Sequence, residues 1–213
     1  MLFTIGHSQH EVNYFIELLR KHEVNYILDV RSTPYSQFAA QYNKDAIKRV
    51  LSDKGINYAF MGKYFGARQE EDSLYTREGY LDFQKTAQSA NFKVGVDNVL
   101  KGISAGNRIA FMCTEKDPIE CHRAILVGKA FWDIGIDVQH ILPDASLQSQ
   151  SFLNERLMTM YFPDRAQISL FSENNLSDEE CLRLSYLKQN EKIGYHKDED
   201  WAKMRDMKNI VAI

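Results

Sequence analysis

Short apolar runs alternate with amphipathic helical patterns along the first two thirds of this chain, and that alternation limits the folds open to it. Several runs are apolar at nearly every position, which is typical of strands buried on both faces of a parallel sheet. Helical segments between such strands act as right-handed crossovers. The sequence therefore predicts an α/β fold with an open, mostly parallel sheet of about five strands flanked by helices. The predicted strands are 2–6, 25–31, 57–61, 108–113 and 137–141.

Capping signals mark where the predicted helices begin. Ser8 and Glu11 have the spacing of a capping box, in which each side chain bonds a backbone N–H at the helix entrance. A second helix is predicted over 44–54. A third should begin at the Asp-Pro pair 117–118, an acceptor cap followed by the residue favoured at the first helical position, and end at Gly135.

Two regions break the alternation. Residues 61–79 form an irregular, aromatic-rich loop insertion that is long enough to be functional. After the last strand no sixth strand is predicted, and the clearest element is a helix that begins with a second capping box, Ser177 and Glu180. We therefore predict an α/β core domain at 1–143 and a C-terminal, partly helical appendage at 144–213 that packs on the core or serves in assembly.

Composition excludes several protein classes. With 44% apolar and 26% charged residues and no apolar run near the ~18 residues that cross a bilayer, the chain is not expected in a membrane. The net charge of −3 argues against coating nucleic acid through bulk positive charge, but is compatible with a local basic pocket. Three cysteines without disulfide spacing, and no export signal in 1–4, indicate the reducing cytoplasm.

Polar residues follow the predicted strands at the end where parallel sheets bind ligands. Because the carboxyl ends of parallel strands share one edge, we expect these groups to lie together although they are far apart in the sequence. They are His7, Ser8, Asp29, Arg31, Cys113, Glu115, Cys121, His122, Arg123 and His140.

Most of these residues fall into three motifs. The motifs are Gly6-His7-Ser8, Asp29-Val30-Arg31 followed by Pro34, and Cys113-x-Glu115 with Cys121-His122-Arg123. In this combination the chain resembles the family of domain of unknown function 488, over residues 2–142. Further matching pieces are Phe65-Gly66-Ala67-Arg68, Gly79-Tyr80 with Phe83, and Val138-Gln139-His140-Ile141. The resemblance implies an α/β fold and a shared polar site but no activity, and Ala67 departs from it, since a second glycine is expected there.

The segment 113–123 offers thiols, carboxylates, an imidazole and a guanidinium near a helix start, where unpaired N–H groups favour anions. Arg31, Arg123 and this helix start would hold an anion. Cys113, at the end of a strand, is the candidate nucleophile, whereas Cys121 could face either the site or the core. Both thiols could equally be small buried hydrophobes.

His7 and Glu115 are the candidates for acid–base catalysis. An imidazole titrates near neutrality, and we expect His7 to be exposed toward the same edge. A loop histidine that only hydrogen-bonds its neighbours is the alternative. Asp29 and Arg31 alternate on one strand and share a face, where Asp29 could orient Arg31 toward an anion or simply pair with it.

Metal binding is a further option. Cys113, Glu115, Cys121 and His122 are acceptable ligands by type, as are His7 and His140. Seven residues separate the two cysteines, however, unlike the tight pairs of structural zinc sites. Neighbours on a helix point about 100° apart, so Cys121 and His122 could bind one ion only if the helix begins later than predicted. The sequence therefore assigns no metal ligand.

The aromatic-rich insertion offers a second kind of contact. It contains Tyr64 and Arg68, with Lys63 and Arg77 also interleaved among its aromatic residues. Such a lid could stack on a base and neutralise a phosphate. A loop with a small aromatic core of its own is the simpler alternative.

Together these patterns predict a cytoplasmic protein with a polar, anion-accepting site at the carboxyl edge of the sheet. The hypothesis is a hydrolase or transferase acting on a nucleotide, a nucleic-acid end or another phosphorylated substrate. Its alternatives are a non-catalytic nucleotide- or nucleic-acid-binding module and a metal-dependent hydrolase. The cofactor stays open; the expected partner is a small phosphorylated molecule or nucleic acid and no membrane, with room for a homo-oligomer. The predicted catalytic residues are Cys113, Glu115 and His7, and the predicted substrate-binding residues are Ser8, Asp29, Arg31, Tyr64, Arg68, Cys121, His122 and Arg123.

Overall fold

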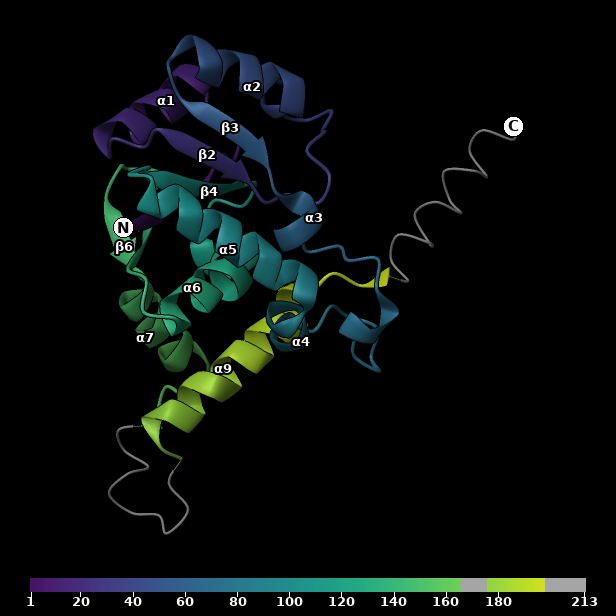
Figure 1. The fold of residues 1–213 in the computed structure, drawn as a ribbon. Helices are drawn as coiled ribbons and strands as arrows, with labels where there is room; N and C mark the ends of the chain where they lie inside the picture. Colours follow the sequence, from purple (N-terminus) through teal and green to yellow (C-terminus); the bar gives the residue numbers. More distant parts are fainter. Residues whose placement is uncertain (166–175, 198–213) are drawn as a thin grey trace.

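A single sheet organises the computed structural model, which describes residues 1–165 and 176–197 (Figure 1). The strand order is β3-β2-β4-β1-β5-β6, and every neighbouring pair is parallel except β5 with β6. The predicted open, mostly parallel α/β sheet is confirmed, and all five predicted strands are present. The strands are β1 (Leu2–Gly6), β2 (Tyr26–Asp29), β3 (Asn57–Phe60), β4 (Ile109–Cys113), β5 (Val138–Ile141) and β6 (Leu147–Ser149).

The antiparallel edge strand β6 is the difference from the sequence prediction, which has no strand after β5. A tight turn joins the two strands, and in it Ala145 adopts a left-handed backbone with φ of 64°. The Ala145 N–H donates to the Leu142 carbonyl at 2.9 Å. Because β6 has only three residues, its alternation is too short to be recognised in the sequence.

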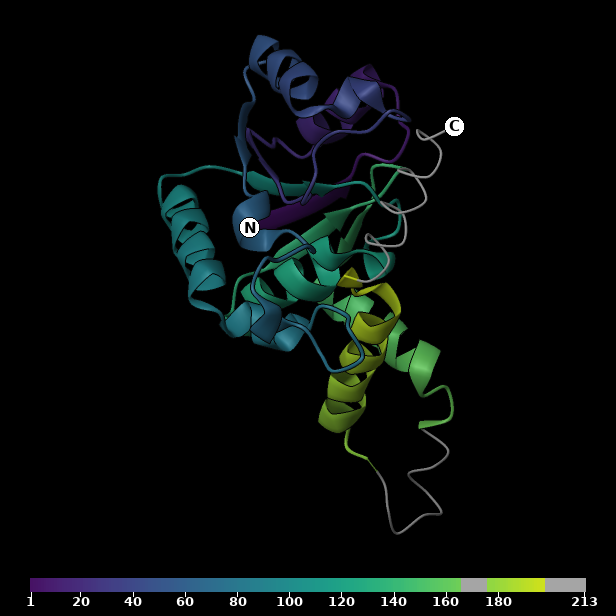
Figure 2. The ribbon, with the colours of Figure 1, turned by 90° about the vertical axis from the view of Figure 1, so that its right-hand side faces the viewer.

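Helices cover both faces of the sheet, because successive strand residues point to opposite faces and both sets are apolar. On β1, Phe3 and Ile5 pack into the core under α1 (Val12–Lys21) and α2 (Lys44–Asp53), and Leu2 packs into the core on the opposite face. Figures 1 and 2 show the two helical layers on either side of the strands. The first layer is α1 and α2; the second includes α5 (Ala90–Ser104), the π-helical η4 (Arg123–Gly128) and α6 (Lys129–Asp133).

The capping box predicted at Ser8 and Glu11 does not form. Helix α1 begins at Val12 after Glu11, with no side-chain cap bond, and Ser8 has a left-handed φ of 47°. The backbone N–H groups of His7 and Ser8 instead donate to the carbonyls of Cys113 and Thr114, at 2.9 and 2.8 Å. These bonds extend the pairing of β1 with β4, so Ser8 is held before it can cap the helix.

The helix predicted over 117–135 is split in two. The Asp117 carboxylate accepts from the Ile119 N–H as predicted, but only one 3₁₀ turn follows, η3 (Pro118–Glu120). Cys121 is then extended, with φ of −138° and ψ of 135°, and the helix resumes at Arg123. The helix proper therefore begins later than the capping signal indicates.

The aromatic-rich insertion contributes to the main core. It contains the short segments α3 (Gly62–Phe65) and η2 (Asp72–Leu74). Phe65 is fully buried and meets the rings of Phe92, Phe111 and Phe131, with centroids 4.9, 5.6 and 6.2 Å away. These contacts fix α3 near the carboxyl ends of the strands.

Helices α7 (Gln150–Tyr161) and α9 (Asp178–Ile193) of the C-terminal part pack together beneath the second layer (Figure 2). The capping box at Ser177 and Glu180 is present at the start of the longer one. The division into domains at residue 143 stays a prediction, and residues 166–175 and 198–213 of the predicted appendage lie outside the described residues. No helix in the described ranges is long and apolar enough to cross a membrane. The remaining helices are η1 (Ala40–Tyr42) and α4 (Phe83–Gln88).

Replacing Asn190 with alanine should detach α9 from the segment that precedes α4. The buried Asn190 amide accepts from the Phe83 N–H and donates to the Leu81 carbonyl, both at 2.8 Å. Its loss leaves both backbone groups unpaired, and we expect the free energy of unfolding to fall by about 2–4 kcal/mol in urea denaturation. Glu191→Ala, exposed on the same helix, is the control, and an Asn190→Ala protein as stable as this control would refute the contact's importance.

Candidate functional site

One pocket lies at the carboxyl edge of β2 and β4, which are neighbours in the sheet. It encloses about 220 Å³ and is called the site pocket below. Its walls come from the ends of the two strands, from the insertion after α3, and from a residue that follows α9, segments that Figure 1 shows converging there. The lining residues are Arg31, Ser32, Thr33, Ala67, Arg68, Cys113, Thr114, Glu115, His122 and Tyr195.

Two thiols, an imidazole and a carboxylate meet at the base of this pocket. The Glu115 Oε2 atom lies 3.2 Å from Cys113 Sγ and 2.9 Å from Cys121 Sγ. His122 Nδ1 lies 3.8 and 4.0 Å from the same two sulfur atoms. The donor atoms of Cys113, Cys121 and His122 all lie within 4.8 Å of one another, and the three residues are buried. Glu115 as a whole residue is exposed, but its carboxylate turns inward against the thiols.

A backbone carbonyl orients the imidazole of this cluster. His122 Nε2 lies 3.0 Å from the Val30 carbonyl oxygen, which can only accept a hydrogen bond. The proton is therefore on Nε2, and in the neutral ring the Nδ1 lone pair faces the two sulfur atoms. This imidazole could act as a base or as a metal ligand.

The break in the helix brings Cys121 to the cluster. Because Cys121 is extended and the helix resumes only at Arg123, Cys121 and His122 do not diverge as neighbours on one helix would. The thiol of Cys121 faces Cys113 and Glu115, and the Arg123 N–H donates to it at 3.5 Å. Sequence spacing alone leaves the direction of Cys121 open, and the structure turns it toward the site.

The charges around the cluster shift its proton equilibria in opposite directions. Burial opposes ionisation of Cys121, but the Cys113 thiol and the Arg123 guanidinium outweigh it and hold the pKa of Cys121 well below the usual thiol value. The hydrogen bond to Cys121, together with burial, raises the pKa of Cys113 well above it. Loss of water around the carboxylate, together with the nearby Cys121, raises the pKa of Glu115. Groups this close share protons, so they titrate as a set.

Arg123 supports the loop after β4 and does not line the site pocket. Its side chain is fully buried, and its guanidinium donates to the carbonyls of Glu115 at 2.7 Å and Lys116 at 3.3 Å. Gly6 leaves room for this arrangement, because a Cβ there would lie 1.8 Å from the Glu115 carbonyl oxygen. The geometry gives Arg123 a positioning role in place of the anion contact expected from the sequence.

Comparison with protein families shows which family the residues around this cluster belong to. Residues 11–129 match the family described as domain of unknown function DUF488. The chain belongs to this family. No curated protein and no solved structure matches the chain. The DUF488 match includes both motifs that form the site pocket, at 29–31 and 113–123, and it ends before β5 and α9. The family's description assigns no activity, so the chemistry must be argued from the residues.

Arg31 forms part of one wall of the site pocket, whereas Asp29 lies buried behind it and does not line the pocket. Arg31 binds Asp29 through Nε at 2.9 Å and Nη2 at 2.6 Å, and it also donates to the Tyr42 carbonyl and to His7 Nε2. The Tyr58 hydroxyl donates at 2.7 Å to Asp29 Oδ2, the oxygen that also accepts from Arg31 Nη2. Although burial opposes the charge, Asp29 raises the pKa of Arg31 above its ordinary value. Arg31 is thus a fixed cation held at the pocket.

His7 is buried, contrary to the exposure expected from the sequence. Only 1% of its surface is accessible, and its ring stacks on Tyr42 at 4.2 Å. Nδ1 lies 2.8 Å from the Ser8 carbonyl and Nε2 accepts from Arg31, so both nitrogens are engaged. Burial lowers the pKa of His7 to about 4. His7 therefore orients Arg31, and neither His7 nor Ser8 lines the site pocket.

The insertion supplies one of its two predicted contacts. Arg68 lines the site pocket, with its guanidinium 4.6 Å from the ring centroid of Tyr195. Tyr64 lies elsewhere, against Gly95 of α5 and under the Lys63 ammonium, which is 4.4 Å from its ring centroid. Sequence reasoning misses Tyr195, because no pattern links a residue after α9 to the end of β4.

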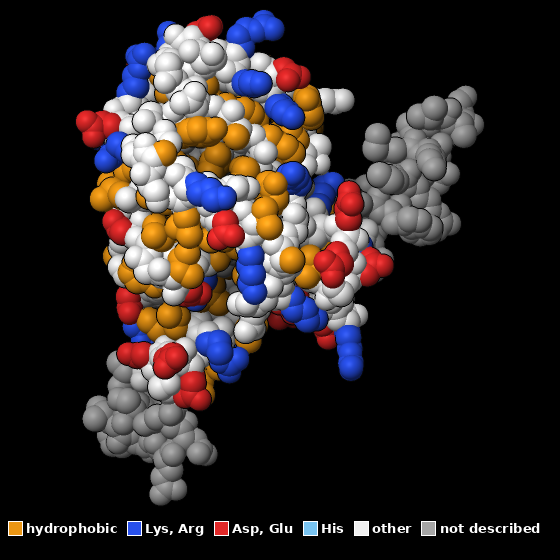
Figure 3. Space-filling model, viewed as in Figure 1, with side chains coloured by type: hydrophobic (Ala, Val, Ile, Leu, Met, Phe, Trp, Pro, Cys, Tyr) orange, Lys and Arg blue, Asp and Glu red, His pale blue; other side chains and the backbone are white. Residues whose placement is uncertain are grey.

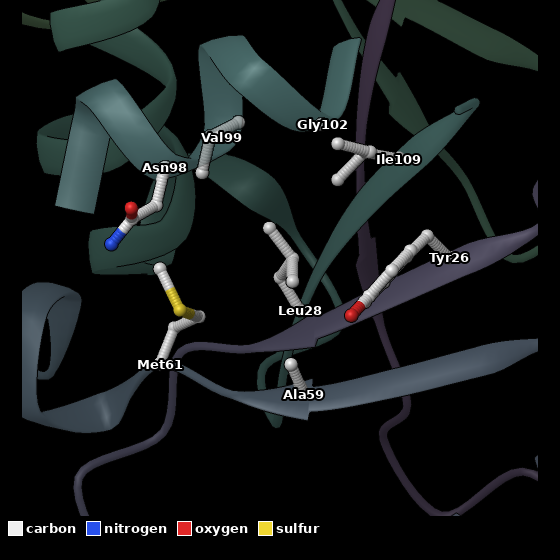
Figure 4. Close-up of a pocket in the computed structure, with 8 residues that line it drawn as sticks. All are labelled: Tyr26, Leu28, Ala59, Met61, Asn98, Val99, Gly102 and Ile109. Carbon is white, nitrogen blue, oxygen red and sulfur yellow. The ribbon is translucent and has the colours of Figure 1, made fainter. Parts of the chain in front are cut away.

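Another cavity of about 150 Å³ lies between α5 and strands β2 and β3 (Figure 4). Apart from the Tyr26 hydroxyl and the Asn98 amide, its labelled side chains carry no oxygen or nitrogen atom. It contains none of the residues of the thiol cluster, and no carboxylate, imidazole or thiol lines it. Its lining residues are Tyr26, Leu28, Ala59, Met61, Asn98, Val99, Gly102 and Ile109.

Gly6→Ala should disrupt the loop that carries Glu115. The new methyl group would overlap a backbone oxygen, which no side-chain rotation can relieve, so we expect a loss of at least about 2 kcal/mol of unfolding free energy. Gly102→Ala is the control, since its Cβ would meet only the flexible end of Ile109 at 3.0 Å. Equal urea midpoints for the two variants would contradict the close approach.

His140 should make stability depend on pH. It is fully buried beside Thr4, and burial lowers its pKa to about 3. The unfolded chain protonates its histidine near pH 6.5, so the stabilisation is complete above that pH and is lost as the pH falls toward 3. Between pH 7 and pH 5 we expect a loss of up to about 2 kcal/mol, which His140→Gln should remove from the pH profile of urea unfolding. An unchanged profile in the variant would refute this assignment.

Proposed function

We propose that this protein is a hydrolase acting on a small phosphorylated substrate bound in the site pocket. The observation that carries the proposal is that Glu115, with Cys113 and His122, lines the same small pocket as Arg31 and Arg68. A proton-transferring carboxyl group and two cations therefore face one volume. At about 220 Å³, this volume is below the ~300–1,000 Å³ of pockets for drug-sized ligands, so it suits a phosphate group and the atoms next to it.

Arg31 is the better-oriented of the two cations. A guanidinium has five N–H groups, and the contacts to Asp29, Tyr42 and His7 use four of them. Within the described ranges one N–H of Nη1 is left for a ligand. Fixing a donor before the ligand arrives lowers the entropy cost of binding, which favours Arg31 as the contact to a phosphate oxygen.

Arg68 and three hydroxyl groups complete the proposed phosphate contacts. The Ser32 hydroxyl accepts from the Arg68 N–H at 2.9 Å, so the two residues hold each other at the pocket wall. Thr33 and Thr114 add further donors on the same lining. Arginine and hydroxyl groups together are a usual set for binding phosphate oxygens.

Glu115 would transfer the protons of the reaction. In the proposed step it takes a proton from water while the water oxygen forms a bond to the electrophilic atom of the substrate. The bond to the leaving group breaks with its electron pair, and Glu115 returns the proton to that group. No redox partner is needed, and Glu115 ends the cycle in the state in which it began.

One face of the molecule favours a small ligand over a nucleic-acid coat. On the face shown in Figure 3, basic and acidic side chains are interspersed and no continuous basic area crosses it. A protein that holds many phosphates needs such an area. Recognition of a nucleotide or of a single nucleic-acid end stays within the proposal.

Glu115→Gln should separate catalysis from binding. We expect turnover of a phosphorylated substrate, found by screening nucleoside monophosphates and sugar phosphates, to fall by about 100-fold or more. Thermal stabilisation by inorganic phosphate should persist in this variant. In Arg68→Gln, phosphate affinity should fall by about 10- to 100-fold, because a charged hydrogen bond is lost.

Arg20→Gln, exposed on α1, is the matched control and should bind phosphate like the wild type. If phosphate does not stabilise the wild-type protein, or stabilises Arg68→Gln equally, the phosphate site is wrong. If Glu115→Gln turns substrate over at the wild-type rate, Glu115 is not the proton-transferring group.

A further inference from the structure

We propose that Cys113, Cys121 and His122 hold one divalent transition-metal ion, of the zinc type, at the base of the site pocket, with Glu115 beside an open fourth position. The role of the ion in hydrolysis rests on the function proposed above, whereas the metal site itself does not. Cysteine, cysteine and histidine with an open position are a ligand set of catalytic zinc ions.

The distances fit a single ion. Bonds of ~2.3 Å to sulfur and ~2.0 Å to nitrogen in a tetrahedral centre place ligand atoms roughly 3.5–3.8 Å apart. His122 Nδ1 lies 3.8 and 4.0 Å from the two sulfur atoms, so it would move by only a few tenths of an ångström. The three donor atoms all lie within 4.8 Å of one another. Small side-chain rotations therefore close the site.

The imidazole is prepared for coordination. A metal-binding histidine usually donates its second N–H to a carboxylate or a backbone carbonyl, which fixes the tautomer and the direction of the ring. The 3.0 Å contact of His122 Nε2 with the Val30 oxygen is such a bond. It leaves Nδ1 as the only ring atom able to bind an ion, and Nδ1 is the atom that faces the sulfurs.

The charges of the cluster also call for a cation. Glu115 Oε2 lies 3.2 Å from Cys113 Sγ and 2.9 Å from Cys121 Sγ, so three groups that can carry negative charge meet at one point. A divalent ion balances two thiolates and leaves the carboxylate to interact with water.

The position of the site in the pocket favours a catalytic over a structural ion. Cys113, Glu115 and His122 all line the site pocket, so a fourth ligand can come from solvent or substrate. A water molecule bound to zinc loses a proton near pH 7. Glu115, beside both sulfur atoms, is placed to accept that proton.

The closing experiment measures metal, not activity. Full-length protein without an affinity tag is purified, its metal content is determined by mass spectrometry, and the metal-free protein is titrated with Zn²⁺ against a chelating indicator. We expect about one equivalent per chain and a tight site. Cys113→Ser, Cys121→Ser and His122→Asn should each weaken Zn²⁺ binding by at least about 100-fold, beyond the effect of losing a supporting residue.

Cys181→Ser is the matched control, since Cys181 is a buried free cysteine of α9 outside the cluster. It should bind Zn²⁺ like the wild type. Co²⁺ added to the metal-free wild type should give thiolate charge-transfer absorption, which tests the ligands without relying on a variant's folding. A wild type that binds Zn²⁺ no more tightly than the three variants, or gives no such absorption, overturns the metal site.

Glu115→Gln separates the two proposals. It should retain Zn²⁺ with less than about a 100-fold loss of affinity, because Glu115 is a supporting residue beside the two sulfur atoms and not one of the three ligands. A protein that binds Zn²⁺ but hydrolyses no phosphorylated substrate refutes the hydrolase and supports the metal site. Hydrolysis at the full rate by metal-free protein refutes the role of the ion in hydrolysis and supports the hydrolase, while the Zn²⁺ titration alone decides the metal site.

Discussion

Arg123 buries its guanidinium beneath the loop that follows β4 and binds the carbonyls of Glu115 and Lys116. A buried cation is costly unless its N–H groups find acceptors, so the loop must keep these carbonyls turned inward. Gly6 makes the turn sterically possible, since any side chain there would meet the Glu115 oxygen. The loop in turn fixes Cys113 at one end and Cys121 at the other. The geometry of the whole thiol cluster therefore depends on this one backbone-directed contact.

The site joins groups from opposite faces of the sheet. Ile27, two residues before Asp29 on β2, packs in the core with α1 and α2, whereas Cys113 packs in the core with α5 and α6. Side chains on opposite faces can meet only where the sheet ends. At the carboxyl edge of β2 and β4, Arg31 reaches around from one side and the thiol cluster from the other, which places a fixed cation opposite ionisable groups in one pocket.

The sequence predicts the sheet, its crossovers and the Asp29–Arg31 pair, because each is encoded by a local period or spacing. It does not predict the direction of Cys121. The Asp-Pro signal at 117–118 correctly marks a capped turn, but no local rule says that the turn stops after one 3₁₀ segment and that the helix resumes at Arg123. That break depends on the loop's contacts with Arg123 and β1, which are tertiary. Tyr195 and the Val30 carbonyl are unpredictable for the same reason, since both join the site through distant parts of the chain.

Ala67, where the family resemblance leads us to expect a second glycine, differs from Gly66 in what its surroundings allow. Gly66 cannot carry a side chain, because a Cβ would lie 2.5 Å from the Gly62 carbonyl and 2.8 Å from Ser32 Oγ. Ala67 has no left-handed backbone, so a methyl group is tolerated there without strain. Its methyl lines the site pocket beside Arg68, where a glycine would leave more room. The close contacts thus require glycine at residue 66, whereas the side chain at residue 67 alters only the space available to a ligand.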